Sequence, residues 1–299
     1  MRLYSALIGL SLIWGMSFVF IKWITDAAGV WGTVFFRCLA GILILLPLLW
    51  WKRKQITSTF QWRHVIIVGL FNAGLPWGLI ALSETQIHTS TASVLNALTP
   101  IFTGLIGFLF FSKKLTRQQW MGILLGFCGI LILTEFQIHM ILGENFIGMG
   151  TMVLATLCYG FASQYAKQYL QQMHVLLIST CTLLVGTLTG LVGMIVTNTI
   201  PTQMEFNGTV ILSIIGLGCF GSGIAYLLFY FLMIEGSPEF ATTVTYLIPV
   251  TAIMWGYILM KEPITQHLLL GLFIILFGIY FTNRKPKIMI EKTRANSME

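Results

Sequence analysis

Apolar residues occur along this chain in runs of about 20, and short polar segments separate the runs. A run of that length crosses a bilayer as a helix. The pattern predicts ten transmembrane helices, at residues 4–24, 31–50, 62–83, 91–111, 118–136, 146–168, 174–197, 209–233, 240–260 and 266–283. Strands of a membrane barrel would alternate apolar and polar residues, and runs such as GILILLPLLW do not. The predicted fold class is therefore an all-α integral membrane protein.

The composition excludes a soluble domain. It is 57% hydrophobic and 9% charged, whereas soluble domains carry about 25% charged residues. The first run has a charged start at Arg2, as a signal peptide would, but no small-residue cleavage site follows it. We expect it to remain as a helix of the mature chain.

The net charge of +7 is distributed unevenly between the predicted loops. If the N-terminus is cytoplasmic, 14 of the 17 cationic residues lie on the inner side and the outer loops hold only Lys261. This bias predicts a multi-pass protein of the cytoplasmic membrane with both termini inside the cell. The basic clusters are then topology signals, so the expected partners are the lipid bilayer and a small-molecule substrate, with no nucleic acid. A monomer is compatible with the sequence.

Two shifts relate the halves of the chain to each other. A shift of 149 residues pairs five glycines of the first half with glycines of the second, and it also pairs Pro100 with Pro249. Nearer the start a shift of 145 pairs Lys22 with Lys167. Each half holds five predicted helices, so the second half enters the membrane from the opposite side. We expect two inverted five-helix repeats, 1–140 and 141–284, and a basic cytoplasmic tail, 285–299. Inverted repeats are typical of secondary transporters.

The paired prolines fall near the middle of the predicted helices 91–111 and 240–260. A proline inside a helix removes a backbone hydrogen bond and frees a carbonyl, which must find a partner in the protein or in a wet cavity. We therefore predict that Pro100 and Pro249 are hinges beside a central cavity. The alternative is a pair of kinks that serve packing alone.

Several segments resemble the EamA branch of the drug/metabolite transporter superfamily. LIWGMSFVFIKWI resembles its first-helix pattern and FFRCLAGILILLP its second, while the segments that begin TASVLNALTP and ATTVTYLIPV resemble its repeated signature. The resemblance covers residues 4 to 283. It implies a ten-helix carrier that exports amino acids or other small metabolites, with a cavity lined by the first four helices of each half. Where that family has Gly-Glu after the fourth helix, this chain has Ser112-Lys113, whereas the second half keeps Glu262.

Two cations fall within predicted helices, where a charge is costly and points to function. Arg37 lies six residues past Trp31, and Lys22 lies in the last turn of the first helix. Both could hold a substrate carboxylate, Arg37 by a two-pronged contact. Alternatively, Lys22 extends to the membrane surface and Arg37 braces helix-end carbonyls.

Aromatic and neutral polar residues at mid-helix positions complete the candidate binding site. An aromatic wall with a few amide and hydroxyl groups is typical of small-molecule sites, although each member could also serve packing or an interhelical hydrogen bond. The candidates are Asn72, Trp77, Asn96, Tyr159, Gln164, Tyr226 and Tyr246.

The remaining residue types set limits on the chemistry. Acidic residues such as Glu84 and Glu235 lie at helix ends, none at the predicted midplane, so proton coupling stays open. The histidines do not cluster and the cysteines lie within helices, so we expect no metal and no cofactor. The motifs HExxH and GxSxG and a P-loop do not occur, and Asp26 is the single aspartate, so an intramembrane enzyme is not expected. A carrier of lipid-linked solutes or nucleotide sugars, or a non-transporting receptor, remains an alternative.

Overall fold

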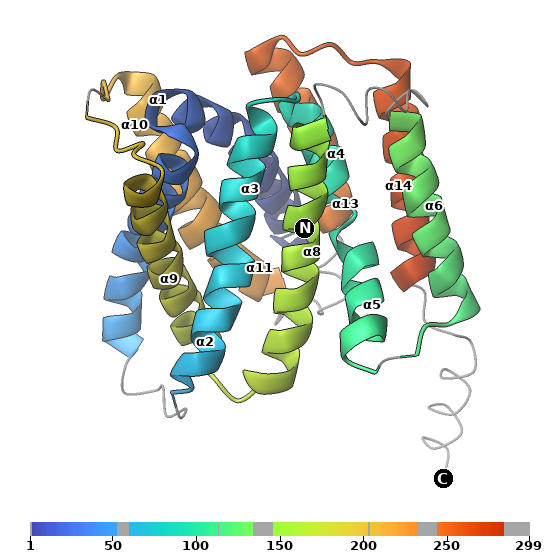
Figure 1. Cartoon of the computed structure of the whole chain (residues 1–299), viewed down its shortest axis with the longest axis horizontal. Helices are drawn as coiled ribbons and strands as arrows, with labels where there is room; N and C mark the ends of the chain where they lie inside the picture. The colour runs from blue at the N-terminus through green and yellow to red at the C-terminus, as the bar shows by residue number, and fades with distance from the viewer. Residues whose placement is uncertain are drawn as a thin grey trace.

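The computed structural model describes residues 2–52, 60–112, 114–133, 146–202, 204–232 and 244–283, and these residues form a bundle of helices without strands (Figure 1). The first helix, α1 (Arg2–Lys52), is too long for one crossing and breaks at Gly29, whose φ is 72°. That left-handed backbone favours glycine. The two parts of α1 on either side of Gly29 contain the predicted helices 4–24 and 31–50.

The next two predicted helices change their helical geometry along their length. α2 (Trp62–Gly69), the π-helical segment η2 (Leu70–Gly74) and α3 (Leu75–Glu84) follow one another within residues 62–84. The span of residues 89–110 divides into α4 (Thr89–Asn96) and α5 (Thr99–Phe110). α6 (Arg117–Leu133) ends the first half as the structure describes it.

The second half follows the same order. It contains α8 (Phe146–Tyr169), α9 (Val175–Val196), α10 (Gly208–Ile214), the π-helical segment η3 (Ile215–Ile224), α11 (Ala225–Phe231), α13 (Val244–Trp255), the π-helical segment η5 (Gly256–Met260) and α14 (Gln266–Asn283). Five of the described helical spans are long and apolar enough to cross a membrane, and four shorter apolar helices accompany them. The all-helical fold is as predicted; the count of ten crossings stays a prediction.

Glycines allow the helices of the two halves to approach closely. α6 and α14 lie side by side (Figure 1), and a Cβ on Gly129 would lie 3.1 Å from the carbonyl oxygen of Gly271, while one on Gly278 would lie 2.7 Å from that of Gly122. The 149-residue shift converts the first contact into the second. The inverted repeat remains a prediction, and this reciprocal contact supports it.

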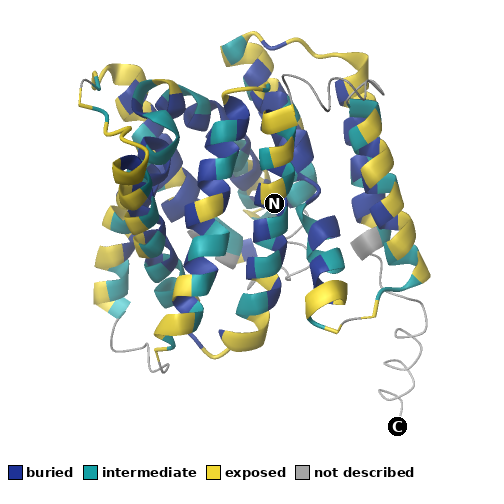
Figure 2. Ribbon diagram, viewed as in Figure 1, coloured by how far each residue is buried: buried dark blue, intermediate teal, exposed yellow. Residues whose placement is uncertain are grey.

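The outer faces of the bundle are apolar. Figure 2 shows buried positions on the inward faces of most helices and exposed positions on the perimeter, and the exposed positions include Leu43, Phe273 and Val192. Such a surface is suited to lipid tails, which exclude unsatisfied backbone groups but accept apolar side chains.

The charge asymmetry gives a topology prediction for the tail, which lies outside the described residues. We expect a C-terminal fusion to a reporter that works only in the cytoplasm to be active, because the basic clusters remain on the inner side. The same reporter after residue 137, in a predicted outer loop, is the matched control and should be inactive. Activity of an externally active reporter at the C-terminus would contradict this orientation.

Candidate functional site

A cavity of about 460 Å³ lies in the middle of the bundle, between the two halves of the chain. Both parts of α1, the segment from η2 to α3, and α4 with α5 line it from the first half. From the second half, α8, η3, α11 and α13 contribute. Of the predicted site residues, seven line it: Arg37, Asn72, Trp77, Asn96, Pro100, Tyr159 and Pro249.

Arg37 supplies the cationic charge of this cavity. Its guanidinium carbon lies 3.7 Å from the centre of the Trp77 ring, an arrangement in which the face of the indole attracts the cation. Arg37 is only 9% exposed and Trp77 6%. In such a setting the guanidinium keeps its charge and its flat donor fork, which matches a carboxylate better than an ammonium does.

Asn96 supplies an acceptor in the same cavity. Its Oδ1 is buried and has no hydrogen-bond partner among the described residues. A buried acceptor of this kind is costly unless a ligand or water occupies it. Asn96 therefore suits an N–H donor on a small molecule that enters the cavity.

π-helical turns lie at related positions in the cavity wall. Asn72 lies in η2, while Gly221 and Ser222 lie in η3. The 149-residue shift places the residues equivalent to η2 inside η3. A π-helical turn re-aims side chains and often marks a functional site, which is why these residues reach the cavity from helices that would otherwise turn them aside.

The α-helical hydrogen-bond pattern changes just before Pro100. α4 ends at Asn96, α5 begins at Thr99, and Pro100 lies in the first turn of α5, where a missing N–H costs little. The carbonyl of Asn96, which a residue other than proline could have bonded, instead accepts a hydrogen bond from the Thr99 hydroxyl at 2.7 Å. Pro249, in contrast, lies inside α13. Ala97 and Leu98, between the two helices, keep a right-handed helical backbone, so α4 and α5 form one membrane span with a tightened turn before Pro100.

We predict that Pro100→Ala and Pro249→Ala each reduce transport severalfold while the protein still inserts in the membrane. Alanine restores the N–H and favours a continuous helix, which should hinder exchange between conformations. The measurement is flux in proteoliposomes at equal protein content. Pro47→Ala is the matched control, because Pro47 lies in α1 with its side chain exposed. Unchanged flux in both site variants would leave packing as the role of the prolines.

Three predicted site residues, Lys22, Gln164 and Tyr246, are absent from the described lining of the cavity. The Nζ of Lys22 donates a hydrogen bond to the carbonyl oxygen of Glu84 at 2.7 Å and lies 3.9 Å from Oδ1 of Asp26. Gln164 donates to the carbonyl oxygen of Thr103 at 2.9 Å and so joins α8 to α5. Tyr246 packs against the main apolar core. The side chain of Tyr226, the remaining candidate, lies outside the described part.

Glu262 contacts the start of α4, at the end of the bundle where α3 and α4 meet. This end is the upper one in Figure 1. The carboxylate of Glu262 accepts hydrogen bonds from the backbone N–H groups of Thr89, at 2.7 Å, and Ser90, at 2.9 Å. It also accepts from both hydroxyl groups, that of Thr89 at 2.8 Å. We call these four hydrogen bonds the Glu262 cap. The cap places an anion at the first turn of α4, where the helix dipole favours it, and it joins the two halves.

The same contact controls the ionisation of Glu262. Burial acts to raise the pKa of this carboxyl group, but the hydrogen bonds from Ser90 and Thr89 outweigh burial and hold the pKa below its ordinary value. Glu262 is therefore an anion at neutral pH. Lys113, which the 149-residue shift aligns with Glu262, lies outside the described residues.

Sequence reasoning missed several hydroxyl-bearing residues of the cavity. Ser17, Ser93 and Ser163 line it, as does Trp14, whose Nε1 donates to the carbonyl oxygen of Gly221 at 3.1 Å. Serine is common in packed membrane helices, so its occurrence alone is no signal. The 145-residue shift aligns Ser17 with Ala162 rather than with Ser163, so the repeat gave no signal for these serines either.

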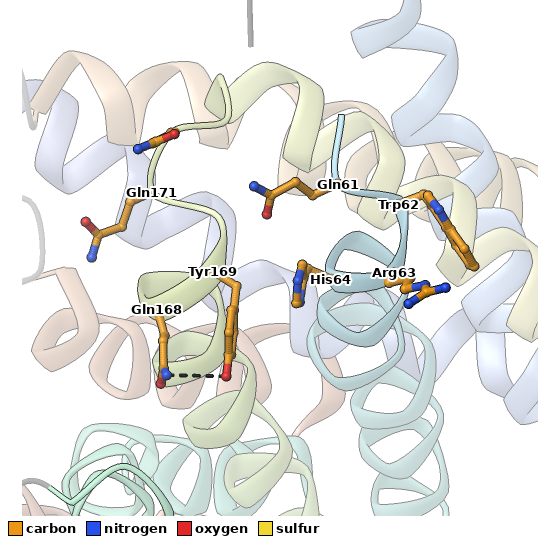
Figure 3. Close-up of a pocket in the computed structure, with 8 residues that line it drawn as sticks. Gln61, Trp62, Arg63, His64, Gln168, Tyr169 and Gln171 are labelled. Carbon is orange, nitrogen blue, oxygen red and sulfur yellow. Dashed lines mark hydrogen bonds between the residues drawn. The ribbon is translucent and has the colours of Figure 1, made fainter. Parts of the chain in front are cut away.

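A second cavity, of about 530 Å³, lies at the opposite end of the bundle from the Glu262 cap, between the start of α2 and the end of α8 (Figure 3). The His64 ring stacks on Tyr169 with 4.6 Å between ring centres, and its Nδ1 lies 2.9 Å from the hydroxyl of Tyr165. Glutamines form much of its wall, including Gln61 and Gln168. It lies at an end of the helices, and the described part of its wall comes from the start of α2 and the end of α8 with the residues beside them. It therefore does not have the central placement of the first cavity.

The chain is similar over most of its length to several proteins that are named as transporters. An uncharacterized transporter of Archaeoglobus fulgidus is 23% identical over 91% of this chain and 95% of its own length. The uncharacterized transporter YoaV of Bacillus subtilis is 22% identical over 96% and 99%. The uncharacterized inner membrane transporter YedA of Escherichia coli is 25% identical over 93% and 89%.

A crystal structure matches with a TM-score of 0.60 at 12% identity, over 94% of this chain and 97% of the other, which shows a shared fold. The model of the EamA-like transporter family matches residues 1–135 and 146–284, the two stretches that carry the cavity. With most of its length matched, the chain belongs to the EamA-like transporter family.

Proposed function

We propose that this membrane transporter exports small metabolites, amino acids or related carboxylates, by alternating access about the central cavity. The observation that carries the proposal is that one cavity contains both a cationic donor and a buried hydrogen-bond acceptor. Arg37 offers a cationic donor and Asn96 a buried acceptor. An α-amino acid carries a carboxylate and an ammonium group, which these two side chains would engage respectively.

The size and the lining of the cavity support a small solute. Its volume of about 460 Å³ lies within the range of about 300–1,000 Å³ found for small-molecule sites. Aromatic faces such as those of Trp14 and Tyr159, next to Phe18, suit an apolar side chain of the substrate. A single arginine gives too little positive charge for the diphosphate of a nucleotide sugar.

Alternating access requires two arrangements of similar energy. The reciprocal glycine contacts and the related π-helical turns support an exchange of conformation between the halves, as inverted repeats permit. The Glu262 cap then holds one end of the cavity closed. Its opening, together with closure at the other end, would move the solute across the membrane.

A counterflow screen in proteoliposomes tests the substrate class. Vesicles loaded with one unlabelled compound are supplied outside with a trace of the same labelled compound, and accumulation marks a substrate. The panel contains amino acids, their amides and methyl esters, nucleotide sugars and lipid-linked sugars. We expect accumulation of amino acids above that of their amides. Accumulation of nucleotide sugars or lipid-linked sugars alone would replace this proposal, and no accumulation of any compound would favour a non-transporting role.

A further inference from the structure

Glu84 carries a buried carboxyl group that does not line the cavity. It is the last residue of α3 and is 0% exposed. Both of its carboxylate oxygens lack a hydrogen-bond partner among the described residues, as does the adjacent hydroxyl of Ser83. Burial of an ionised carboxylate without hydrogen bonds is among the most costly arrangements in a protein, so a carboxyl group left in this state points to a function.

The charged groups that act on Glu84 come from two parts of the chain. α1 contributes Lys22, Asp26 and Arg37, and the chain beyond η5 contributes Glu262. His88, which precedes α4, lies next to Glu262, with its Nδ1 3.8 Å from Oε1 of that residue. The only charged side chain of α8, which also packs on α3, is Lys167 in its last turn.

Within the described part of the chain, neither cation near Glu84 donates a hydrogen bond to its carboxylate oxygens. The Lys22 ammonium contacts the backbone carbonyl of Glu84 and the carboxylate of Asp26, while the Arg37 guanidinium lies over Trp77. The end of α3 also carries the negative pole of the helix, which disfavours an anion. These surroundings suit the neutral, protonated form of the Glu84 carboxyl group.

Glu84 and Glu262 thus form a contrasting pair at one end of the bundle. Glu262 has four donors and suits the anionic form, whereas Glu84 has none. When two neighbouring carboxyl groups lie in environments that favour different protonation states, the one that favours the protonated form is a candidate for proton transfer.

The position of Glu84 connects it to the transport path. Ile80, one turn earlier on α3, lines the cavity, and Ser93, one turn after Ser90 on α4, lines it as well. Glu84 and the Glu262 cap therefore lie between the cavity and the α3–α4 end of the bundle. The 149-residue shift aligns Glu84 with Met233 in the sequence, and the nearest acid of the second half, Glu235, lies two residues further along and outside the described residues.

We propose that Glu84 is a proton-binding site of the transporter, and that its proton exchanges with solution only when the Glu262 cap opens. A proton taken from water at the α3–α4 end forms the O–H bond of the carboxyl group, and the same bond breaks when the proton leaves. Because the Glu262 cap lies between Glu84 and the solution at this end, proton exchange is tied to the arrangement of the carrier in which the cap is open. The proposal rests on the transporter function but not on the identity of the solute.

Infrared spectroscopy of the full-length protein in lipid nanodiscs tests this proposal without a substrate. We expect the wild-type protein at neutral pH to show the C=O stretching band of a protonated carboxyl group, and Glu84→Gln to lack it. Glu205→Gln, at an exposed position, is the matched control and should keep the band. On transfer to D2O the band should shift slowly in the wild type and at least tenfold faster in Glu262→Gln, in which the cap is weakened.

Each contrary result overturns one part of the proposal. Absence of the band in the wild type would mean that Glu84 is an anion neutralised by Lys22 and Arg37. A band that persists in Glu84→Gln would assign the proton to another acid. Equal exchange rates in the wild type and Glu262→Gln would remove the cap from the proton path. If Glu84→Gln does not fold, Glu84→Asp serves instead, because it should keep a protonated carboxyl group and shift its band. None of these outcomes depends on the counterflow screen.

Discussion

Replacement of Arg37 by lysine is expected to lower transport of a carboxylate substrate about tenfold, equivalent to about 1.4 kcal/mol, and to lower transport of its amide much less. Lysine keeps the positive charge but loses the donor fork that binds both carboxylate oxygens. It also loses the flat contact of the guanidinium with Trp77, whose ring centre lies 3.7 Å away. The measurement is initial flux in proteoliposomes for the acid and the amide of one amino acid from the counterflow screen.

The chain offers a matched control for this substitution. Arg63 also lies over a tryptophan, with 5.3 Å between its guanidinium carbon and the ring centre of Trp62, but at an end of the bundle. Arg63→Lys should therefore leave the ratio of acid to amide transport unchanged. If Arg37→Lys reduces acid and amide equally, Arg37 braces the helices and the carboxylate contact is wrong.

Removal of the Glu262 side chain is expected to have the largest effect on stability. Glu262→Ala leaves two backbone N–H groups and two hydroxyl groups at the start of α4 without their acceptor. Glu262 is 5% exposed, and a buried polar group left without its hydrogen-bond partner costs about 1 to 3 kcal/mol. We expect a clear decrease in the thermal unfolding temperature of the detergent-solubilised protein, measured by intrinsic tryptophan fluorescence.

The pH dependence of the same contact has a definite sign. The hydrogen bonds of the cap hold the pKa of Glu262 below the ordinary value of 4.5 in the folded protein. The stabilisation is therefore fully present above pH 4.5 and disappears as the pH falls through the lowered pKa. The difference between the wild type and Glu262→Ala should be constant near neutral pH and shrink in acid. Glu205→Ala, at an exposed position, should match the wild type throughout, and a gap that widens in acid would contradict the assignment.

The sequence by itself determined the class of the protein and identified part of the cavity lining. A run of about 20 apolar residues crosses the bilayer as a helix, because a helix satisfies its own backbone hydrogen bonds. The change of direction at Gly29 falls in the gap between the first two predicted helices, residues 25–30. Arg37 could be assigned to the cavity from its position within an apolar run, because a charge there is tolerated only where it has a role.

Only the tertiary structure decided which polar groups meet. Lys22 and Arg37 look alike in the sequence, yet Lys22 bonds the end of α3 while Arg37 lies in the cavity. Glu84 and Glu262 both follow long apolar runs. The carboxylate of Glu84 has no hydrogen-bond donor among the described residues, whereas that of Glu262 has four. The reason is that Glu262 meets Thr89 and Ser90 across more than 170 residues of chain. Local periodicity determines which face of a helix is apolar, but the contacts between helices depend on how all of them pack together.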